Sequence, residues 1–280
     1  MKTAICYSGE ASRINLEFIK TELSQLICDE IHVFCSFWDN GVSQNNLFDE
    51  FQSVVNDSKN KLIKLEVRPQ LSPQLRYDHS HLWSKANSVP NTYSMFASIK
   101  FADILRQQYE IENNFQYDLV IRARPDTVLS KNIDLIEIKN ILDNEAMVVF
   151  SRSNNSFWIW HNKIGMLADT FWIANSNIMT QITNLDFEQC CDEGCRCHPE
   201  SVLWWRIVKQ LEIPLHLQIK EIPWYRFLDF KANVRNISDP DCEAGYIIRR
   251  MEEWASSDDV KELKLVEILK TLGIDISQLF

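Results

Sequence analysis

Apolar and polar positions in the first half of the chain follow two alternating patterns. Short runs of β-branched and aromatic residues are typical of buried strands, and four such runs occur at Ala4–Tyr7, Ile31–Ser36, Leu62–Val67 and Tyr117–Ile121. Apolar residues recur at helical spacing in Ser12–Ile27, Phe48–Val55 and Tyr93–Tyr109. With a polar, proline-containing loop from Arg68 to Asn91, this order favours an α/β fold with a mainly parallel, doubly wound sheet.

The second half of the chain is less regular. Apolar runs predict strands at Ala146–Ser151 and Thr170–Ala174, and helical spacing predicts a helix at Ser201–Leu211. An amphipathic helix is expected from Asp258 to Leu272. No internal repeat, low-complexity tract or clear linker interrupts the chain, so a single domain spanning residues 1–280 is expected.

Charged side chains directly follow the strand expected at Tyr117–Ile121. Arg122 and Arg124 are two residues apart, so they point to the same face of an extended segment, and Asp126 follows as the chain leaves the strand. Unpaired charge is costly in a buried position. This group therefore indicates an anionic ligand, a divalent metal at Asp126, or both, at the strand ends where open α/β sheets bind ligands. An internal ion pair between arginine and Asp126 is the alternative.

The turn after the first strand offers further groups that suit an anion. Ser8 and Gly9 end the strand, a helix is expected to start soon after them, and Arg13 adds a positive charge. Free backbone N–H groups at a helix start bind phosphate, and a guanidinium suits a diphosphate. The glycine fingerprint of dinucleotide folds and the Walker lysine are both missing, so a purely structural turn is the alternative.

Two carboxylates in the second half are candidates for a general base. Glu200 lies at the start of the helix expected at Ser201–Leu211, and Asp169 directly precedes the strand expected at Thr170–Ala174. Acidic residues are also favoured in the first turn of a helix, so a capping role for Glu200 stays open. A nearby loop carries potential soft ligands at Cys190, Cys191, Cys195, Cys197 and His198. Their spacing matches no usual zinc motif, and zinc, a disulfide and free thiols are the alternatives.

Composition narrows the class of partner. The net charge of −10 argues against general binding to nucleic acid, which needs a basic surface. No apolar run approaches the roughly 18 residues of a transmembrane segment, and no secretory signal is evident. Eight cysteines without an export signal indicate reduced thiols in a cytosol-like compartment. Nine tryptophans suit sugar or base stacking, although core packing is the commoner use.

Taken together, these segments resemble the glycosyltransferases found in bacterial surface-polysaccharide loci and in large DNA viruses. The resemblance spans roughly residues 3 to 216. Its motifs, in chain order, are SGxxxR, FxxFWD, YSMFASIKFAD, YDLVIRARPD, DTFWIANSNIM and HPE before an aliphatic helix. Chain size, cysteine usage and the missing membrane anchor also suit chlorovirus capsid-glycan glycosyltransferases, one of which is thought to add xylose.

The resemblance implies a single GT-A-like domain with a Rossmann-like sheet. Residues 1–126 would form the nucleotide-sugar-binding half, and residues 127–280, with the C-terminal helix, the acceptor-binding half. Asp126 would hold Mn²⁺ or Mg²⁺ where GT-A enzymes usually carry an Asp-x-Asp motif, with Arg124 in place of the first Asp and His216 as a further match. Glu200 lies where inverting members place the base. The donor contacts implied are Ser8, Gly9, Arg13, Asp39, Lys100, Arg122 and Arg124.

The expected function is transfer of a sugar from a nucleotide-diphosphate donor to a glycan or glycoprotein hydroxyl in the cytoplasm, of the host if the protein is viral. UDP-sugars are favoured, with UDP-xylose as a specific candidate, and Glu200 or Asp169 would act as base in an inverting displacement. The missing first Asp favours a rival, a non-catalytic carbohydrate-binding or glycan-assembly protein with a degenerate metal site. A nucleotidyltransferase would want a glycine-rich basic loop, and the chain has only six glycines.

Overall fold

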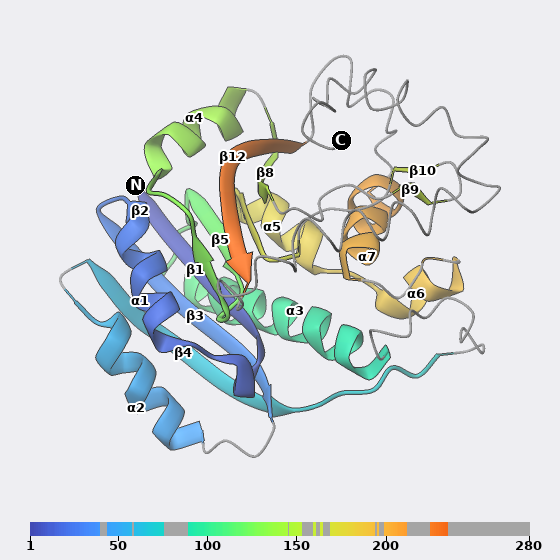
Figure 1. The fold of residues 1–280 in the computed structure, drawn as a ribbon, viewed down its shortest axis with the longest axis horizontal. Helices are drawn as coiled ribbons and strands as arrows, with labels where there is room; N and C mark the ends of the chain where they lie inside the picture. Colours follow the sequence, from blue (N-terminus) through green and yellow to red (C-terminus); the bar gives the residue numbers. More distant parts are fainter. Residues whose placement is uncertain are drawn as a thin grey trace, which may run out of the picture.

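The computed structural model describes residues 1–39, 44–57, 59–75, 89–144, 146–152, 159–160, 163–164, 169–193, 195, 199–211 and 225–234. Within these residues, one eight-stranded sheet forms the centre of the fold, with helices on both faces (Figure 1). Its strand order is β4-β3-β1-β5-β11-β8-β12-β6. None of the described helices is long and apolar enough to cross a membrane.

The sheet has a parallel half and a mixed half. The parallel half consists of β1 (Lys2–Glu10), β3 (Glu30–Asp39), β4 (Asn60–Pro69) and β5 (Leu119–Ala123). The mixed half adds β11 (Phe171–Ala174), β8 (Val148–Arg152), β12 (Tyr225–Val234) and β6 (Thr127–Leu129). Strand β11 is antiparallel to β5 and β8, whereas β12 is parallel to β8 and antiparallel to β6. Two small pairs complete the strands: β2 (Leu26–Ile27) with β7 (Ile133–Asp134), and β9 (Ile159–Trp160) with β10 (Lys163–Ile164).

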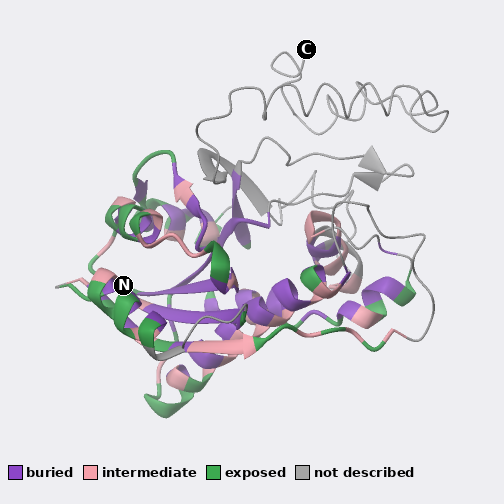
Figure 2. Ribbon diagram, turned by 60° about the horizontal axis from the view of Figure 1, so that its bottom comes forward, coloured by how far each residue is buried: buried purple, intermediate pink, exposed green. Residues whose placement is uncertain are grey.

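Two groups of helices cover the two faces of the sheet. One face carries α1 (Leu16–Gln25), α2 (Gln44–Val55) and α4 (Leu135–Asn144). The other carries α3 (Val89–Glu112), α5 (Ser176–Thr183), α6 (Phe187–Asp192) and α7 (Pro199–Trp205), which continues as a π-helix over Arg206–Gln210. Figure 2 shows the buried residues gathered on the strands and on the helix sides that face them.

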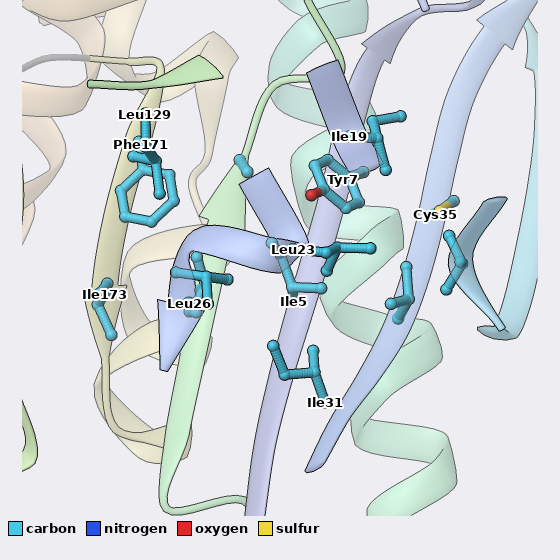
Figure 3. Close-up of a cluster of buried hydrophobic side chains, with 14 of the residues drawn as sticks. Ile5, Tyr7, Ile19, Leu23, Leu26, Ile31, Cys35, Leu129, Phe171 and Ile173 are labelled. Atoms are coloured by element: carbon cyan, nitrogen blue, oxygen red, sulfur yellow. The ribbon is translucent and has the colours of Figure 1, made fainter. Parts of the chain in front are cut away.

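Alternation along the strands separates the two hydrophobic cores. Ile5 and Tyr7 of β1 lie in the core beneath α1 and α2, while Ala4 and Cys6 lie in the core beneath α3. This follows from the two-residue period of a strand, which sends successive side chains to opposite faces. Figure 3 shows Ile5 and Tyr7 packed with Ile19 and Leu23 of α1.

The strand order changes direction between β1 and β5. From β1 the sheet first grows through β3 to β4, and the chain then returns through α3 to place β5 on the opposite side of β1. Such a topological switch point leaves a crevice outside the carboxyl ends of the two strands, because their connections diverge. The residues at the ends of β1 and β5 are therefore positioned by the fold to meet a ligand.

The structure confirms the α/β class and the order of elements expected in the first half, with shifted boundaries. The helix expected from Ser12 begins at Leu16, after a short 3₁₀ turn over Ala11–Arg13, because the side chain of Asn15 caps it by accepting from the N–H of Phe18 at 3.2 Å. The helix expected from Tyr93 already begins at Val89. The helix expected at residues 258–272 lies outside the described residues.

Candidate functional site

A cavity of about 150 Å³ lies at the carboxyl ends of β1 and β5. Its wall combines the end of β1 and the turn after it, the end of β5 with its following turn, the first turns of α3, and the start of α7. The lining residues are Ser8, Gly9, Glu10, Arg13, Trp38, Asn91, Thr92, Met95, Arg122, Arg124, Pro125, Asp126, Asp169 and Pro199.

Arg122 places a buried positive charge in this wall. Its exposed fraction is 1%, and it lies beside Trp172 of the neighbouring strand β11, with the guanidinium carbon 4.8 Å from the ring centroid. One terminal nitrogen donates to the backbone carbonyl of Asp169. Nε and Nη2 are buried and have no hydrogen-bond partner among the described residues. Burial lowers the pKa of Arg122 to about 9, so the group stays charged at pH 7, with donors left over for an anion.

Arg124 connects two of the cavity's carboxylates. Its Nε and Nη2 donate to the two oxygens of Asp126 at 2.9 and 2.8 Å, and its Nη1 lies 3.5 Å from Oδ2 of Asp169. Burial by itself would lower the pKa of Arg124, but Asp169 and Asp126 outweigh it and raise that pKa above its ordinary value, with a smaller effect from Glu200. The guanidinium is therefore a permanent charge held in a fixed orientation.

A close contact between two turns shapes the cavity floor. Gly9 has a φ of +152°, which L side chains rarely adopt, and a Cβ added there would lie 3.4 Å from Cδ of Pro125. The carbonyl of Pro125 accepts from the N–H of Asn15 at 3.0 Å, which ties the turn after β5 to the start of α1. Glycine is thus needed at position 9 for its backbone conformation.

Some of the polar side chains at the end of β1 and in the turn after it already have partners. Nε of Arg13 lies 2.8 Å from Glu10, and the side chain of Arg13 is about half exposed. The hydroxyl of Ser8 is fully buried and has no hydrogen-bond partner among the described residues. Among the described lining residues, Ser8 and Arg122 therefore combine almost complete burial with unused polar atoms.

The structure brings most of the expected site residues together. Ser8, Gly9, Arg13, Arg122, Arg124, Asp126 and Asp169 all line the cavity. Glu200 directly follows the lining residue Pro199 in the first turn of α7, and it acts on the pKa of Arg124. Asp39 lies exposed at the end of β3 and Lys100 half-buried on α3, and neither is in the lining. Position 216 is outside the described residues.

Several lining residues were not expected from the sequence. Asn91, Thr92 and Met95 belong to the first turns of α3, whose start the polar loop before it obscured. In the sequence, Trp38 stood out only as part of the FxxFWD motif, and tryptophan more commonly serves core packing. The sequence signal that could have found them is topological: α3 leads into β5, so its start lies at the same sheet edge as the end of β1.

The donor groups around Asp126 determine whether a divalent metal fits there. Both oxygens of Asp126, whose side chain is 2% exposed, already accept from Arg124. Among the described residues, no three His, Cys, Asp or Glu side chains form a group that could hold a metal ion. Mg²⁺ and Mn²⁺ prefer several oxygen ligands without a cation on the same carboxylate. The described residues fit such a metal poorly, and the metal at Asp126 stays a prediction.

The cysteine loop shows no disulfide in its described part. Cys190, Cys191 and Cys195 are buried, and the N–H of Cys195 donates to the carbonyl of Cys190 at 3.0 Å. The hydrogen bond with Cys195, together with burial, raises the pKa of the Cys190 thiol. A protonated thiol is a poor zinc ligand. Positions 197 and 198 lie outside the described residues.

Comparisons with protein-family models and with curated proteins found no match to this chain. The resemblance to glycosyltransferases therefore stays a prediction, and any assignment of function depends on the fold and the site.

Proposed function

We propose that the cavity binds the diphosphate of a nucleotide-sugar donor and that this chain is a glycosyltransferase. The observation that carries the proposal is Arg122, a buried guanidinium at the switch point of the sheet with two N–H-bearing nitrogens that lack a partner among the described residues. Buried N–H donors without a hydrogen-bond partner are expensive. An anionic ligand would repay that cost, and a diphosphate suits a guanidinium fork.

Neighbouring groups support the choice of a diphosphate over a single carboxylate. Ser8 adds an unused hydroxyl, and Gly9 lets a ligand approach the backbone at the end of β1 because it has no side chain. Arg124 provides a second guanidinium on the same wall. Two fixed positive charges next to a small polar cavity match a ligand with two linked phosphates.

The carboxylates of the site supply the proposed base. Asp169 lines the cavity, and Glu200 lies next to the lining residue Pro199 at the start of α7. Either would take the proton from an acceptor hydroxyl, whose oxygen then bonds to the anomeric carbon of the donor sugar as the bond from that carbon to the diphosphate breaks. The departing electron pair stays on the diphosphate, where Arg122 and Arg124 stabilise the added charge. This is an inverting displacement, and no step in it depends on a metal.

The finer features of the proposal come from the sequence resemblance. They are a GT-A-like fold, a UDP-sugar as the donor with UDP-xylose as a candidate, and a glycan or glycoprotein as the acceptor. The net charge of −10 supports a small anionic donor bound at a local site over nucleic acid as the partner.

The test is a panel of nucleotide sugars that covers UDP, GDP, CDP, ADP and dTDP donors, each measured with Mn²⁺, with Mg²⁺ and with EDTA. Released nucleoside diphosphate and the shift of the melting temperature are recorded for each. We expect one donor class to stabilise the protein and to release its diphosphate. Absence of any shift and any release across the panel would refute the proposal.

The rival function has a distinct outcome in the same panel. A non-catalytic carbohydrate-binding protein would be stabilised by free glycans and would release no nucleoside diphosphate from any donor. The variant Arg122→Met separates the two further, because it removes the anion-binding group and should abolish only stabilisation by nucleotides.

A further inference from the structure

We propose that Arg124 takes the place of a divalent metal in this site, so that the donor diphosphate binds and leaves without one. This inference rests on the proposed function, since it concerns how the same cavity neutralises the diphosphate. It concerns a single side chain in a position where a metal-binding carboxylate was expected, and the contacts of that side chain carry it.

Geometry is the first support. Arg124 holds Asp126 through two parallel hydrogen bonds of 2.9 and 2.8 Å, and the carboxylate is almost fully buried beneath it. Such a two-point contact fixes the plane of the guanidinium. Asp126 therefore acts as an anchor that orients Arg124, and a metal bound to the same oxygens would lie against a permanent positive charge.

The unused donors of Arg124 are the second support. A guanidinium has N–H groups on three nitrogens, and two of these nitrogens are engaged by Asp126. The third, Nη1, has only the long 3.5 Å approach to Asp169 among the described residues. The side chain is 18% exposed although the carboxylate that anchors it is buried, and it lines the cavity. A phosphate oxygen would meet Nη1 there and would replace its weak contact with Asp169.

The backbone fixes where this charge lies. The N–H of Arg124 donates to the carbonyl of Thr170 at 3.1 Å, and its carbonyl accepts from Oγ1 of Thr127 at 3.0 Å. Arg122, two residues earlier on the same face, contributes the buried guanidinium beside it. The two arginines hold two fixed positive charges in a wall that also carries Asp126 and Asp169. Fixed positive charge is what electrostatic stabilisation of a departing diphosphate needs.

The experiment measures binding of UDP and of Mn²⁺ separately, on the full chain. Titration calorimetry follows UDP, or the nucleoside diphosphate selected by the donor panel, in EDTA and again with Mn²⁺ or Mg²⁺. Electron paramagnetic resonance follows MnCl₂ alone and with UDP. We expect UDP to bind equally with and without metal. Addition of the protein should leave the Mn²⁺ signal unchanged, both for MnCl₂ alone and for MnCl₂ with UDP.

Variants assign the effect to Arg124. Arg124→Met should weaken UDP binding about tenfold or more, because it removes a charge-assisted contact, and Arg124→Lys should restore part of it. The matched control is Arg68→Met, an arginine on β4 that is outside the cavity lining and is paired with Glu66. The melting temperature of each variant shows whether a loss of binding reflects unfolding.

The outcomes separate this inference from the proposed function. UDP binding that requires Mn²⁺, together with a Mn²⁺ site that disappears in Asp126→Asn, would overturn the role of Arg124 and keep a metal-dependent transferase. Full UDP affinity in a folded Arg124→Met variant would overturn it as well. Failure of every nucleoside diphosphate to bind under either condition would overturn the proposed function, and this inference with it.

Discussion

Glu22 should make the stability of this protein depend on pH between about 4.5 and 8. The residue lies on α1 beneath the sheet, its exposed fraction is 0%, and one of its oxygens accepts from the hydroxyl of Tyr7 at 2.7 Å. Tyr7 is the labelled aromatic beside α1 in Figure 3. The other oxygen of Glu22 has no partner among the described residues. Burial raises the pKa of Glu22 from 4.5 to about 8, against the lowering effects of Tyr7 and Arg122.

The sign follows from comparing the folded and unfolded states. Between pH 4.5 and 8 the folded protein keeps the proton on Glu22, whereas the unfolded chain releases it. The stability that the neutral carboxyl contributes is therefore fully present below pH 4.5 and is lost as the pH rises toward 8. One proton changes the free energy of unfolding by about 1.4 kcal/mol per pH unit. Between pH 4.5 and 8 the free energy of unfolding therefore falls by about 3–5 kcal/mol in total.

The variant Glu22→Gln tests this prediction. Its free energy of unfolding and that of the native protein are measured by urea denaturation at pH 5, 6, 7 and 8. The amide does not titrate and its oxygen can still accept from Tyr7. The free energy of unfolding of the native protein should therefore fall relative to that of the variant as the pH rises. The control is Glu137→Gln, a change at a solvent-exposed position on α4. Its free energy of unfolding should differ from that of the native protein by the same amount at every pH. A difference between the native protein and Glu22→Gln that does not change with pH would refute the reasoning.

Three further predictions concern the site and the core. Gly9→Ala should cost about 1–3 kcal/mol of stability, measured by urea denaturation, because position 9 has a positive φ that L side chains rarely adopt. The same variant should weaken UDP binding in calorimetry, and unchanged stability would contradict the reasoning. Asp169→Asn should lower turnover about 10²–10⁴-fold with UDP affinity kept, and full activity would remove Asp169 as base. Arg106→Met should cost about 3–5 kcal/mol, because Arg106 is 0% exposed and bridges Asp103 and Glu110 at 2.7 and 2.6 Å. The exposed pair of Lys139 with Asp143 is the matched control, with less than about 1 kcal/mol expected for Lys139→Met.

The parallel half of the sheet was the part of the fold that could be predicted from the sequence. Strands β1, β3 and β5 are apolar runs that are buried on both faces, so their hydrophobic patterns mark them without knowledge of their neighbours. The sequence did not predict the short elements, because they show no clear hydrophobic pattern. Helix α6 has six residues, β6 has three, and too few apolar positions repeat in either to show a period. The mixed pairing of β11 was also missed, because strand direction depends on distant partners.

The candidate site also has features that the sequence predicted and features that only the tertiary structure decided. The sequence by itself determined that Arg122, Arg124 and Asp126 leave one strand together, and that Ser8 and Gly9 end another, because each group is local in the chain. Only the tertiary structure decided that these two strand ends are neighbours, and that Asp169, 43 positions after Asp126, lies against both arginines. It also decided that Arg124 holds Asp126 while Arg122 keeps unused donors. Burial and pairing of charges depend on contacts between distant segments, and spacing along a chain does not encode those.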